Sequence, residues 1–596
     1  MIAIFWMVLS TLSSVSTTTV HSPACSSDGV LLPTALPRDP SLWSPSTNLN
    51  ITILGLDDAQ KAALILAFDQ SLVLGAAFNH DHGYKTLNKA FTSAASSSST
   101  FECCMCLWAL AYLSSPNINR DCASDRLVAA KDAVQQALHG CMVMESLLEQ
   151  ELIYAMVARF PENRTNYNGA RFDQEFASRM GEIATTSMKP TLVTADLHTF
   201  FAESIMNTIA WNYYKQEDGS LRDEAKVAKN SLDLALSGAP KHPLALHLTI
   251  HLMEPSSDPS LIAMAVTAGD TLRSVIPPDL AAGIGHLLHM PGHAFTRAAG
   301  GRYHDAVLAN IAGAKDDSNY ISDCGISPDD FYRQLYYTHK HAFLVWAAIM
   351  SGESEVALNA TAKLFSDCNL VKVASNMGGV FFTYPPFKLQ ILLKFGKFTE
   401  LVNEPRPEST GDELLDMYIG AIYFFARSYA QASLGNCFQS YEDRIQFLSL
   451  ASNKTLQNVR VFMIHISDIL DLSEHIMDGR LCRLCSEYMP ECSELDHLTT
   501  AVDIQDTFPY MEPRYWPDNV RSCLGAALLR QNRADQALAV FEKDLTTPQN
   551  PNNGWSLKGK ELALRALGRD EEAEEVAQSF FEAWQFADVD LYEPCF

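Results

Sequence analysis

Two short segments of this 596-residue chain concentrate histidine in a pattern that points to metal chemistry. They read His247-Leu-Thr-Ile-His251-Leu-Met-Glu254 and His286-Leu-Leu-His289-Met-Pro-Gly-His293. Spacings of three and four residues place side chains on one face of a helix. Imidazole is the commonest side-chain ligand for transition metals, and its charge changes near neutral pH. Both segments therefore predict a metal site or a proton-handling site.

Proline residues mark the ends of the helix that the first segment requires. Pro243 lies where a helix can begin, because the first turn needs no N–H group from its first residue. Pro255 follows Glu254 directly and can end the helix there. The two imidazoles and the carboxylate are therefore expected on one short helix.

The elements that must position these residues are helices throughout. Helical periodicity dominates the chain, and alternating strand patterns bounded by turn residues are nearly absent. Paired helices are joined by a turn of the form Gly-x-aromatic-x-x-Ala, as in Gly301-Arg-Tyr303-His-Asp-Ala306. Two related turns begin at Asn532 and Gly568, 36 residues apart, which is close to the 34-residue tetratricopeptide period. The expected fold is all-α, a tetratricopeptide-like helical-repeat solenoid, that is, a superhelix of antiparallel helix pairs.

Composition divides the chain into four parts. Residues 1–24 have a short apolar core and read as a signal peptide. Residues 25–54 are rich in Pro and Ser and are expected to form an extended lead-in. Residues 55–375 are expected to be N-terminal repeats that carry the histidines, and residues 376–596 to be C-terminal repeats.

An early repeat departs from the turn pattern. In Phe78-Asn-His80-Asp-His82-Gly83, His80 takes the place of the aromatic residue that normally packs between the helices. Local rules are broken more often at functional sites. A histidine that simply packs in the core would give the same pattern.

The net charge limits the partners. With 44 Lys and Arg against 70 Asp and Glu, the chain carries a formal charge of −26. A field of this sign repels phosphate backbones and anionic lipid surfaces, so nucleic acid is excluded as a partner. No window after the signal peptide has about 18 uncharged apolar residues, so no integral membrane span is expected.

Several features indicate secretion or residence in the lumen of the secretory pathway. Asn-x-Ser/Thr glycosylation motifs occur at Asn50, Asn163, Asn359 and Asn453. All 14 cysteines follow the expected cleavage region near residues 20–24, and in an oxidising lumen most would pair.

Two cysteine clusters allow alternatives. The group Cys482, Cys485 and Cys492 favours a local disulfide over half of a zinc site. Cys103, Cys104 and Cys106 lie in an apolar helix, where buried thiols or one disulfide are expected in preference to a thiolate metal site.

Together these residues and others resemble a family of long, mostly exported tetratricopeptide-repeat proteins. The segments that carry the resemblance are Phe78–Asp81, Trp108, Ser115–Asn119, His242–Glu254, Gly285–His293, Arg297, Gly301–Tyr303, Tyr337–His339, Glu512-Pro, Trp516-Pro, Arg521, Leu524–Leu529 and Asn553–Leu557. The resemblance implies an α-helical repeat fold and a shared polar site that includes His339. It implies no particular reaction.

The chain departs from this family at several positions. The family pattern around His339 has a second histidine where this chain has Ala342. His341, one residue earlier, points about 100° away on a helix and cannot substitute for it. Gly292 and Ala294 also replace a Ser and an Ile-like residue. These departures predict a site that is weakened or altered in metal preference.

The candidate metal ligands outnumber the positions around one ion. They are His80, His247, His251, Glu254, His286, His289, His293 and His339. Either two ions bind, or some of these residues do not bind an ion themselves but orient the ligands through hydrogen bonds. Imidazole nitrogens with one carboxylate suit zinc, copper or iron better than calcium or magnesium. Glu254 could be a bridging ligand or a general base on metal-bound water.

Residues downstream of the histidines could contact a ligand. Arg297 could hold an anionic group of a substrate, or form a surface ion pair in its repeat. Glu512, Trp516, Arg521 and Trp555 could line the far end of the same cleft. Alternatively, the tryptophans wedge the last repeats together, which base rates for buried tryptophan favour.

The sequence allows two functions, one as an enzyme and one as a binding protein. No phosphate loop, dinucleotide-binding fingerprint, zincin motif or nucleophile elbow occurs in the chain. The first function is therefore a metal-dependent hydrolase or oxidase with a histidine-rich site at the concave face. The alternative is a non-enzymatic scaffold that binds a protein or peptide segment in the concave groove.

Overall fold

The computed structural model describes residues 24–26, 29–32, 43–121, 124–140, 146–163, 169–186, 191–276, 282–548 and 550–596. Nearly all of the predicted signal peptide and part of the predicted lead-in lie outside these ranges.

The described residues form helices almost throughout. The first half contains α1 (Pro45–Asn48), α2 (Asp58–Ala76), α3 (His80–Ser97), α4 (Cys104–Leu113), α5 (Ser124–Gly140), α6 (Leu147–Arg159), α7 (Gly169–Thr185), α8 (Leu192–Thr208), α9 (Asp223–Gly238), α10 (Pro243–Met253), α11 (Pro259–Val275), α12 (Gly285–Phe295) and α13 (Tyr303–Cys324). A π-helix, η1 (Arg333–Tyr337), leads directly into α14 (Thr338–Ser351).

The second half continues with α15 (Ser354–Ser366), α16 (Leu370–Met377), the 3₁₀ helix η2 (Gly379–Thr383), α17 (Phe387–Lys394), α18 (Phe398–Asn403), α19 (Glu413–Ser433), α20 (Cys437–Ala451), α21 (Lys454–Gln457), α22 (Ile466–Leu484), α23 (Glu494–Asp506), α24 (Val520–Arg530), α25 (Ala534–Thr546), α26 (Gly554–Ala566) and α27 (Asp570–Ala583). Two short antiparallel strands, β1 (Arg460–Val461) and β2 (Ile464–His465), form a hairpin before α22.

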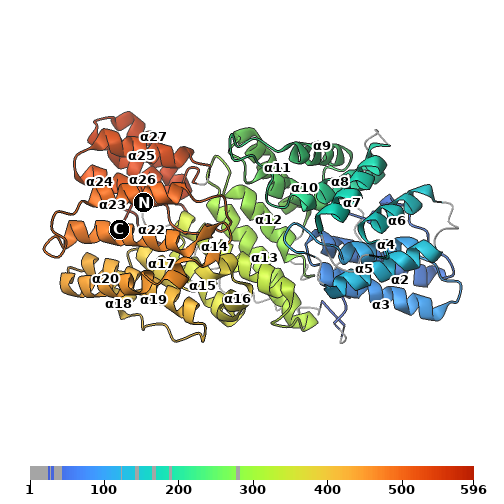
Figure 1. Cartoon of the computed structure of the whole chain (residues 1–596). Helices are drawn as coiled ribbons and strands as arrows, with labels where there is room; N and C mark the ends of the chain where they lie inside the picture. Colours follow the sequence, from blue (N-terminus) through green and yellow to red (C-terminus); the bar gives the residue numbers. More distant parts are fainter. Residues whose placement is uncertain are drawn as a thin grey trace, which may run out of the picture.

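Consecutive helices pack side by side along the chain. Examples are α2 with α3, α8 with α9, α12 with α13, and α19 with α20. Figure 1 shows the order of the sequence kept in space, with α2–α6 at one end, α12–α14 in the middle and α18–α27 at the other end. The predicted all-α helical-repeat solenoid is confirmed.

The turn between paired helices recurs with one backbone conformation. Gly301, Gly352, Gly396, Asn532 and Gly568 have φ angles of 64°, 80°, 65°, 58° and 69°. Left-handed φ values of this kind are strained for most side chains, but glycine and asparagine tolerate them. The repeated turn residue in the sequence therefore has a conformational cause.

Small residues allow the last helices to approach closely. Phe541 of α25 inserts its ring between Gly525 of α24 and Gly559 of α26. A Cβ atom added at Gly559 would lie 2.2 Å from the Phe541 ring, and one at Gly525 would lie 2.3 Å from it. The aromatic residue fills the space that the glycines leave.

Replacing Gly559 with alanine is therefore expected to lower the free energy of unfolding by about 1–3 kcal/mol, the usual cost of overpacking a core. Urea denaturation would measure it. Gly140→Ala is the matched control, because no atom of the described residues lies within 4 Å of the added Cβ at that helical position. Equal stabilities of the two variants would contradict this packing.

Two clusters of buried hydrophobic residues make up most of the core, and they meet at α12. Leu287, Met290 and Ala294 belong to the cluster of the N-terminal half, whereas Phe295 belongs to that of the C-terminal half. The histidines of α12 therefore lie where the two cores meet. The predicted division of the repeats at residue 375 stays a prediction.

Disulfides join both neighbouring and distant segments of the described chain. They join Cys25 to Cys324, Cys103 to Cys106, Cys437 to Cys485, Cys482 to Cys492, and Cys523 to Cys595. Such pairing fits an oxidising compartment.

The pairing resolves both cysteine alternatives. Cys103 and Cys106 form a disulfide, and Cys104 is disulfide-bonded as well, so the cluster holds oxidised cysteines and not the buried thiols that were the other possibility. Cys482 forms a local disulfide with Cys492, while Cys485 pairs with Cys437 on α20.

Among the described helices, none is long and apolar enough to cross a bilayer.

Candidate metal centre

The ends of α10 are set by the residues that the sequence indicated. Pro243 is the first residue of the helix, and the His242 side chain accepts a hydrogen bond from the Ala245 N–H group. The helix ends at Met253, and Glu254 is its C-terminal cap. His247, His251 and Glu254 are thereby held on consecutive turns.

Six histidines from three helices converge in the interior. They are His247 and His251 of α10, His286, His289 and His293 of α12, and His339 of α14. The ring centroids of His247 and His286 are 4.9 Å apart, those of His251 and His293 are 5.6 Å apart, and those of His289 and His339 are 5.0 Å apart.

These histidines form two triads. In the first triad, His247, His251 and His286 each offer a ring nitrogen within 4.8 Å of the others. His289, His293 and His339 do the same in the second triad. All are buried except His339, which is half-buried. Either triad could supply three nitrogen ligands to an ion.

In the first triad, two Nδ1 atoms are held by oxygen atoms. His247 Nδ1 donates to the Ala76 carbonyl oxygen at 2.7 Å, and His251 Nδ1 donates to Glu254 Oε1 at 2.8 Å. With the proton on Nδ1, each Nε2 carries a lone pair. Among the described residues, these two Nε2 atoms and both ring nitrogens of His286 have no hydrogen-bond partner.

The second triad is held in the same way. Asn310 Nδ2 donates to the Ala306 carbonyl oxygen, so Asn310 Oδ1 is the acceptor for His289 Nδ1 at 2.7 Å. His293 Nδ1 lies 2.8 Å from Glu254 Oε2 and 2.6 Å from Glu512 Oε2. Metal-binding histidines characteristically donate their other ring N–H group to a carboxylate or carbonyl oxygen. Four of the six histidines meet that criterion.

Glu254 connects the two triads. Its two carboxylate oxygens accept hydrogen bonds from His251 in the first triad and from His293 in the second. We expected Glu254 to be a metal ligand or a general base. Both oxygens hold histidines, which supports a role in positioning the ligands, and Glu254 also belongs with His251, His293 and Glu512 to a buried group that could itself hold a metal ion.

The electrostatics of the cluster keep most of its histidines neutral. Burial lowers the pKa of His251 and His339 to about 3, and that of His247, His286 and His289 well below the ordinary value. Only neutral imidazole can bind a metal ion. These five histidines are therefore in the ligand form at neutral pH.

His293 differs from the other five. Burial opposes its charged form, but the carboxylates of Glu512 and Glu254 outweigh burial and raise the pKa of His293 to about 10. Its Nε2 atom faces His289 Nε2 at 2.6 Å and His339 Nε2 at 3.3 Å. Without a metal ion, His293 Nε2 can carry a proton and donate it in a hydrogen bond to His289 Nε2, which accounts for the short distance between these two nitrogens. A bound cation would replace this proton.

Phe78 is a part of the site that the sequence interpretation missed. It has a φ of 59°, which is unusual for a bulky residue and characteristic of functional sites. Its ring centroid lies 4.4 Å from that of His247, 5.4 Å from that of His286 and 6.1 Å from that of His251. The available signal was that Phe78 stands at the glycine position of the repeat turn.

His80 lies apart from the triads. It belongs to neither of them, and its ring centroid is 6.3 Å from that of Phe78 and 5.9 Å from that of Tyr112. Burial, with a further contribution from Arg126, lowers the pKa of His80 to about 3. The structure therefore places His80 next to the Phe78 ring but outside both groups of converging ring nitrogens.

The departures from the family pattern can also be placed. Ala342 is fully buried in α14. The His341 ring packs against Tyr337, with centroids 4.7 Å apart, and neither triad contains it. The predicted inability of His341 to substitute agrees with this placement. A Cβ atom at Gly292 would lie 2.9 Å from Asn310 Nδ2, so the glycine leaves room for the residue that holds His289.

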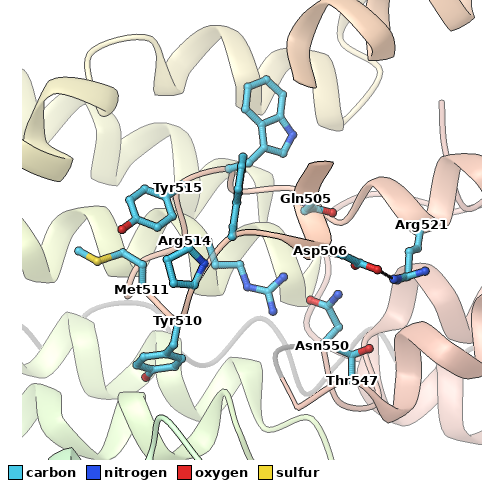
Figure 2. A pocket seen from close by; sticks show the side chains of 12 residues that line it. Gln505, Asp506, Tyr510, Met511, Arg514, Tyr515, Arg521, Thr547 and Asn550 are labelled. Carbon is cyan, nitrogen blue, oxygen red and sulfur yellow. Dashed lines mark hydrogen bonds and ion pairs between the residues drawn. The ribbon is translucent and has the colours of Figure 1, made fainter. Parts of the chain in front are cut away.

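Four of the five downstream candidates lie close to the second triad or to a neighbouring cavity. Glu512, in the loop between α23 and α24, contacts His293 directly. Trp516 and Arg521 line a cavity of about 120 Å³ beside that loop (Figure 2), where Arg521 also pairs with Asp506. Arg297 is buried, and its Nη2 donates to the Ser256 carbonyl oxygen at 2.6 Å.

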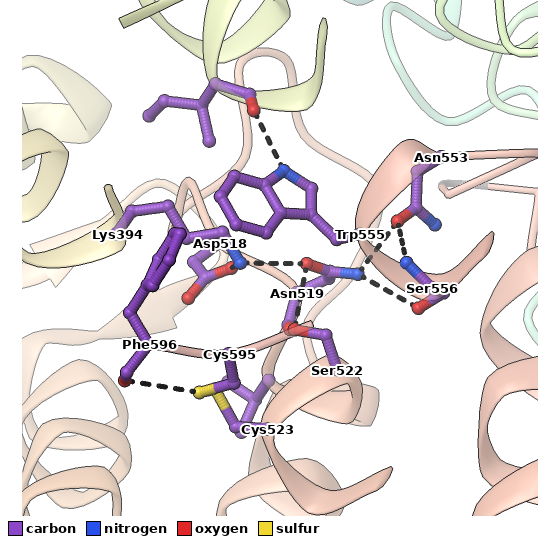
Figure 3. Close-up of polar contacts among 12 residues, drawn as sticks. Lys394, Asp518, Asn519, Ser522, Cys523, Asn553, Trp555, Ser556, Cys595 and Phe596 are labelled. Carbon is purple, nitrogen blue, oxygen red and sulfur yellow. Dashed lines mark hydrogen bonds and ion pairs between the residues drawn. A yellow bond between two sulfur atoms is a disulfide. The ribbon is translucent and has the colours of Figure 1, made fainter. Parts of the chain in front are cut away.

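Trp555 has a packing role. It is fully buried, its Nε1 donates to the Ile349 carbonyl oxygen at 3.0 Å, and Lys394 Nζ lies 3.8 Å from its ring centroid. Figure 3 shows the surrounding network, in which Asn519 contacts Asn553 and Ser556. Trp555 is not among the residues that line the cavity. The arrangement favours the wedge interpretation for this tryptophan.

Two further groups with metal-ligand composition contain oxidised cysteines. Cys25 and Cys324 lie beside His82, and Cys482 and Cys492 lie beside His497. Both cysteine pairs are disulfides. Metal binding requires thiolates, so these groups are not metal sites while their disulfides persist.

The support of His289 can be tested alone. Asn310→Ala removes the acceptor for His289 Nδ1, and loss of such a partner is expected to weaken metal binding about 10- to 100-fold. Competition with a chelator of known affinity would measure the change. Asn212→Ala is the control, because Asn212 is exposed and its side chain contacts Arg222. Unchanged affinity in Asn310→Ala would show that this hydrogen bond does not orient a ligand.

Comparisons of the chain with models of protein families and with curated proteins found no match. The resemblance to exported tetratricopeptide-repeat proteins therefore stays a prediction.

Proposed function

We propose that this chain is an exported metalloprotein whose two histidine triads bind a pair of transition-metal ions for hydrolytic or oxidative chemistry. The observation that carries the proposal is the common orientation of His247, His251, His289 and His293. Each directs its Nδ1 atom to an oxygen and leaves Nε2 for the interior of the cluster.

The donor set narrows the choice of metal. Imidazole suits zinc, copper and iron, whereas calcium and magnesium require a shell of oxygen ligands. Three nitrogen ligands per ion leave a coordination position for water or substrate, as catalytic sites require. Bound zinc would activate water, and bound copper or iron would exchange electrons with a substrate.

The residues of the chain would supply the surroundings of the reaction. Glu254 and Glu512 fix the orientation of His251 and His293 through short hydrogen bonds. The Phe78 ring packs on His247 and His286 of the first triad and would limit access of water to a bound ion. Burial of these groups strengthens their electrostatic interactions.

The test is turnover that requires the metal. The full-length protein, loaded in turn with zinc, copper or iron, would be assayed for hydrolysis of p-nitrophenyl acetate and for oxygen consumption with catechol. Activity in the loaded protein that disappears on chelation and in His289→Ala supports the proposal. Activity that survives both treatments, or no activity with any of the three metals, contradicts it.

Export and glycosylation belong to the same proposal. The disulfides support an oxidising destination. Asn50, Asn163 and Asn359 are exposed and accessible to a glycan. Asn453 is half-buried, and its side chain accepts hydrogen bonds from the backbone of α21. We therefore expect glycans at the first three positions in preference to Asn453.

A peptide-binding scaffold is the second candidate. A cavity of about 490 Å³ lies beside α16–α18 and is lined by Phe365, Val371, Leu389, Ile419 and several prolines. An apolar groove of this kind could take an extended peptide segment. Substituting Leu389 with Asp would abolish capture of a peptide partner by this groove, and would leave metal content unchanged.

A further inference from the structure

Two arginines lie next to the second triad without carboxylate partners. Arg297 follows His293 by one helical turn, immediately after α12. Arg514 follows Glu512 by two residues, in the loop that brings Glu512 to His293. The two arginines therefore come from two different elements, one next to a triad histidine in the chain and the other next to Glu512.

Arg297 is buried with most of its donors unused. Its exposed fraction is 3%. Nη2 donates to the Ser256 carbonyl oxygen, but Nε and Nη1 have no hydrogen-bond partner in the described part of the chain. Its guanidinium carbon lies 5.1 Å from the ring centroid of Tyr510. The charges of Glu254 and Glu512 favour the Arg297 cation, but neither carboxylate forms an ion pair with it, and a buried guanidinium with unused donors is costly to maintain.

Arg514 is the second arginine of this kind, and it lines the cavity of about 120 Å³ beside the loop between α23 and α24. It is half-buried, and its guanidinium carbon lies 5.4 Å from the Trp346 ring centroid. Nη2 is buried and has no partner within the described ranges. Burial and the proximity of Arg297 lower the pKa of Arg514 to about 10, so it stays charged at neutral pH. Tyr510 packs on Arg297 and lines the same cavity as Arg514, so an anion bound in that cavity would offset the repulsion between the two cations.

The nearby carboxylates are already engaged. Glu254 and Glu512 hold His293, and Asp506 pairs with Arg521. Asp544 accepts hydrogen bonds from the side chains of Asn519, Asn550, Asn553 and Ser556. Among the described residues, no ion pair is therefore made to either Arg297 or Arg514.

The adjoining cavity gives an anion a place to bind. Tyr510, Met511, Arg514, Trp516 and Asn550 line it, and Tyr510 also packs on Arg297. Figure 2 shows the Arg514 side chain running into this cavity between its own loop and Asn550. The volume of about 120 Å³ suits a small group better than a polymer.

We propose that Arg297 and Arg514 form an oxyanion-binding subsite, so that the substrate of the metal centre is a small molecule carrying a carboxylate or phosphate group. The inference rests on the proposed function, because the subsite positions a substrate for that centre. Planar guanidinium groups match both oxyanions with paired, charge-assisted hydrogen bonds. The subsite would thus select anionic substrates although the chain as a whole is strongly acidic.

The experiment measures anion binding apart from turnover. Inorganic phosphate and acetate are titrated separately into the full-length, metal-loaded protein and followed by calorimetry. The variants are Arg514→Gln, which changes a half-buried residue, and Arg297→Gln. Arg171→Gln is the matched control, because the Arg171 side chain is 82% exposed on α7. Metal content and melting temperature are recorded for every sample.

The expected result is binding of at least one of the two anions by the unmodified protein. Affinity should fall on the order of 10- to 100-fold in Arg514→Gln and Arg297→Gln, as expected for the loss of charge-assisted hydrogen bonds. Arg171→Gln should bind normally, and metal content should not change. Preference for phosphate would point to a phosphate ester as substrate, and preference for acetate to a carboxylate.

Two results would overturn the inference. One is equal affinity in Arg514→Gln and the unmodified protein. The other is the absence of binding of either anion at about 10 mM, a concentration well above the dissociation constant expected for a charged pair of donors. Because metal content is measured independently, a protein that binds the anions but no metal would contradict the proposed function alone.

Discussion

Replacing His247 and His251 together with alanine is expected to reduce the bound transition metal from about two ions per chain to about one. The substitution removes two of the three nitrogen ligands of the first triad, and a single remaining imidazole cannot hold an ion tightly. The second triad keeps its own anchors at Asn310 and Glu512. Elemental analysis of the purified variant would measure the loss.

The chain offers a matched control for this pair. His475 and His497 also form a histidine pair, with their Nδ1 atoms 2.9 Å apart, but they lie on α22 and α23, away from both triads. Alanine at both of these positions should leave the metal content unchanged. Equal metal content in the two double variants would contradict binding at the first triad.

Acidification of the metal-free protein is expected to destabilise the fold steeply between pH 6.5 and about 4. Outside the triads, burial lowers the pKa of His82 and His341 from 6.5 to about 4. The unfolded chain therefore binds more protons than the folded chain in this interval, and stability that is complete above pH 6.5 is lost as the pH falls. Protonation of each of these two histidines is expected to lower the free energy of unfolding by about 2.5 kcal/mol at pH 4.5 relative to neutral pH.

Some carboxyl groups act in the opposite sense. Burial raises the pKa of Glu203 and Asp316 to about 7, so these groups favour the folded state as the pH falls. Other buried carboxyl groups, such as Asp317 and Glu512, shift in the same direction as Glu203 and Asp316, but five members of the triads shift with His82 and His341, three of them to well below the ordinary value. The net effect is therefore loss of stability in acid.

A single variant isolates this effect. Both ring nitrogens of His341 are buried without a partner among the described residues, so phenylalanine at this position removes a titrating group and no hydrogen bond. His341→Phe should gain about 2.5 kcal/mol relative to the unmodified protein on going from pH 7.5 to pH 4.5. Urea denaturation at both pH values measures this difference. The exposed His139→Phe is the control, and parallel behaviour of the two variants would contradict the assignment.

The fold could be predicted because its signals are local. Helical periodicity, the recurring turn and Pro243 all act within a few residues, and left-handed φ values at Gly301 and Asn532 explain why those residue types recur. The convergence of His247, His251 and His286 could also be predicted. Histidines spaced to lie on one face of each helix have few other arrangements when those helices stack side by side.

The remainder of the site depends on contacts between residues far apart in the chain. Glu512 reaches His293 across more than two hundred residues, and no spacing rule connects them. The hydrogen bond from His289 to Asn310 depends on the packing of α12 against α13. His80 shows the converse, because a conspicuous local departure from the turn pattern belongs to a residue that neither triad contains.

The metal content of the full-length protein tests the central claim most directly. The protein would be produced in a secreting host without a histidine tag or chelating resin, and analysed for all transition metals. About two ions of zinc, copper or iron per chain are expected, one for each triad. Transition metal well below one ion per chain, even after incubation with each metal and removal of the excess, would contradict the claim.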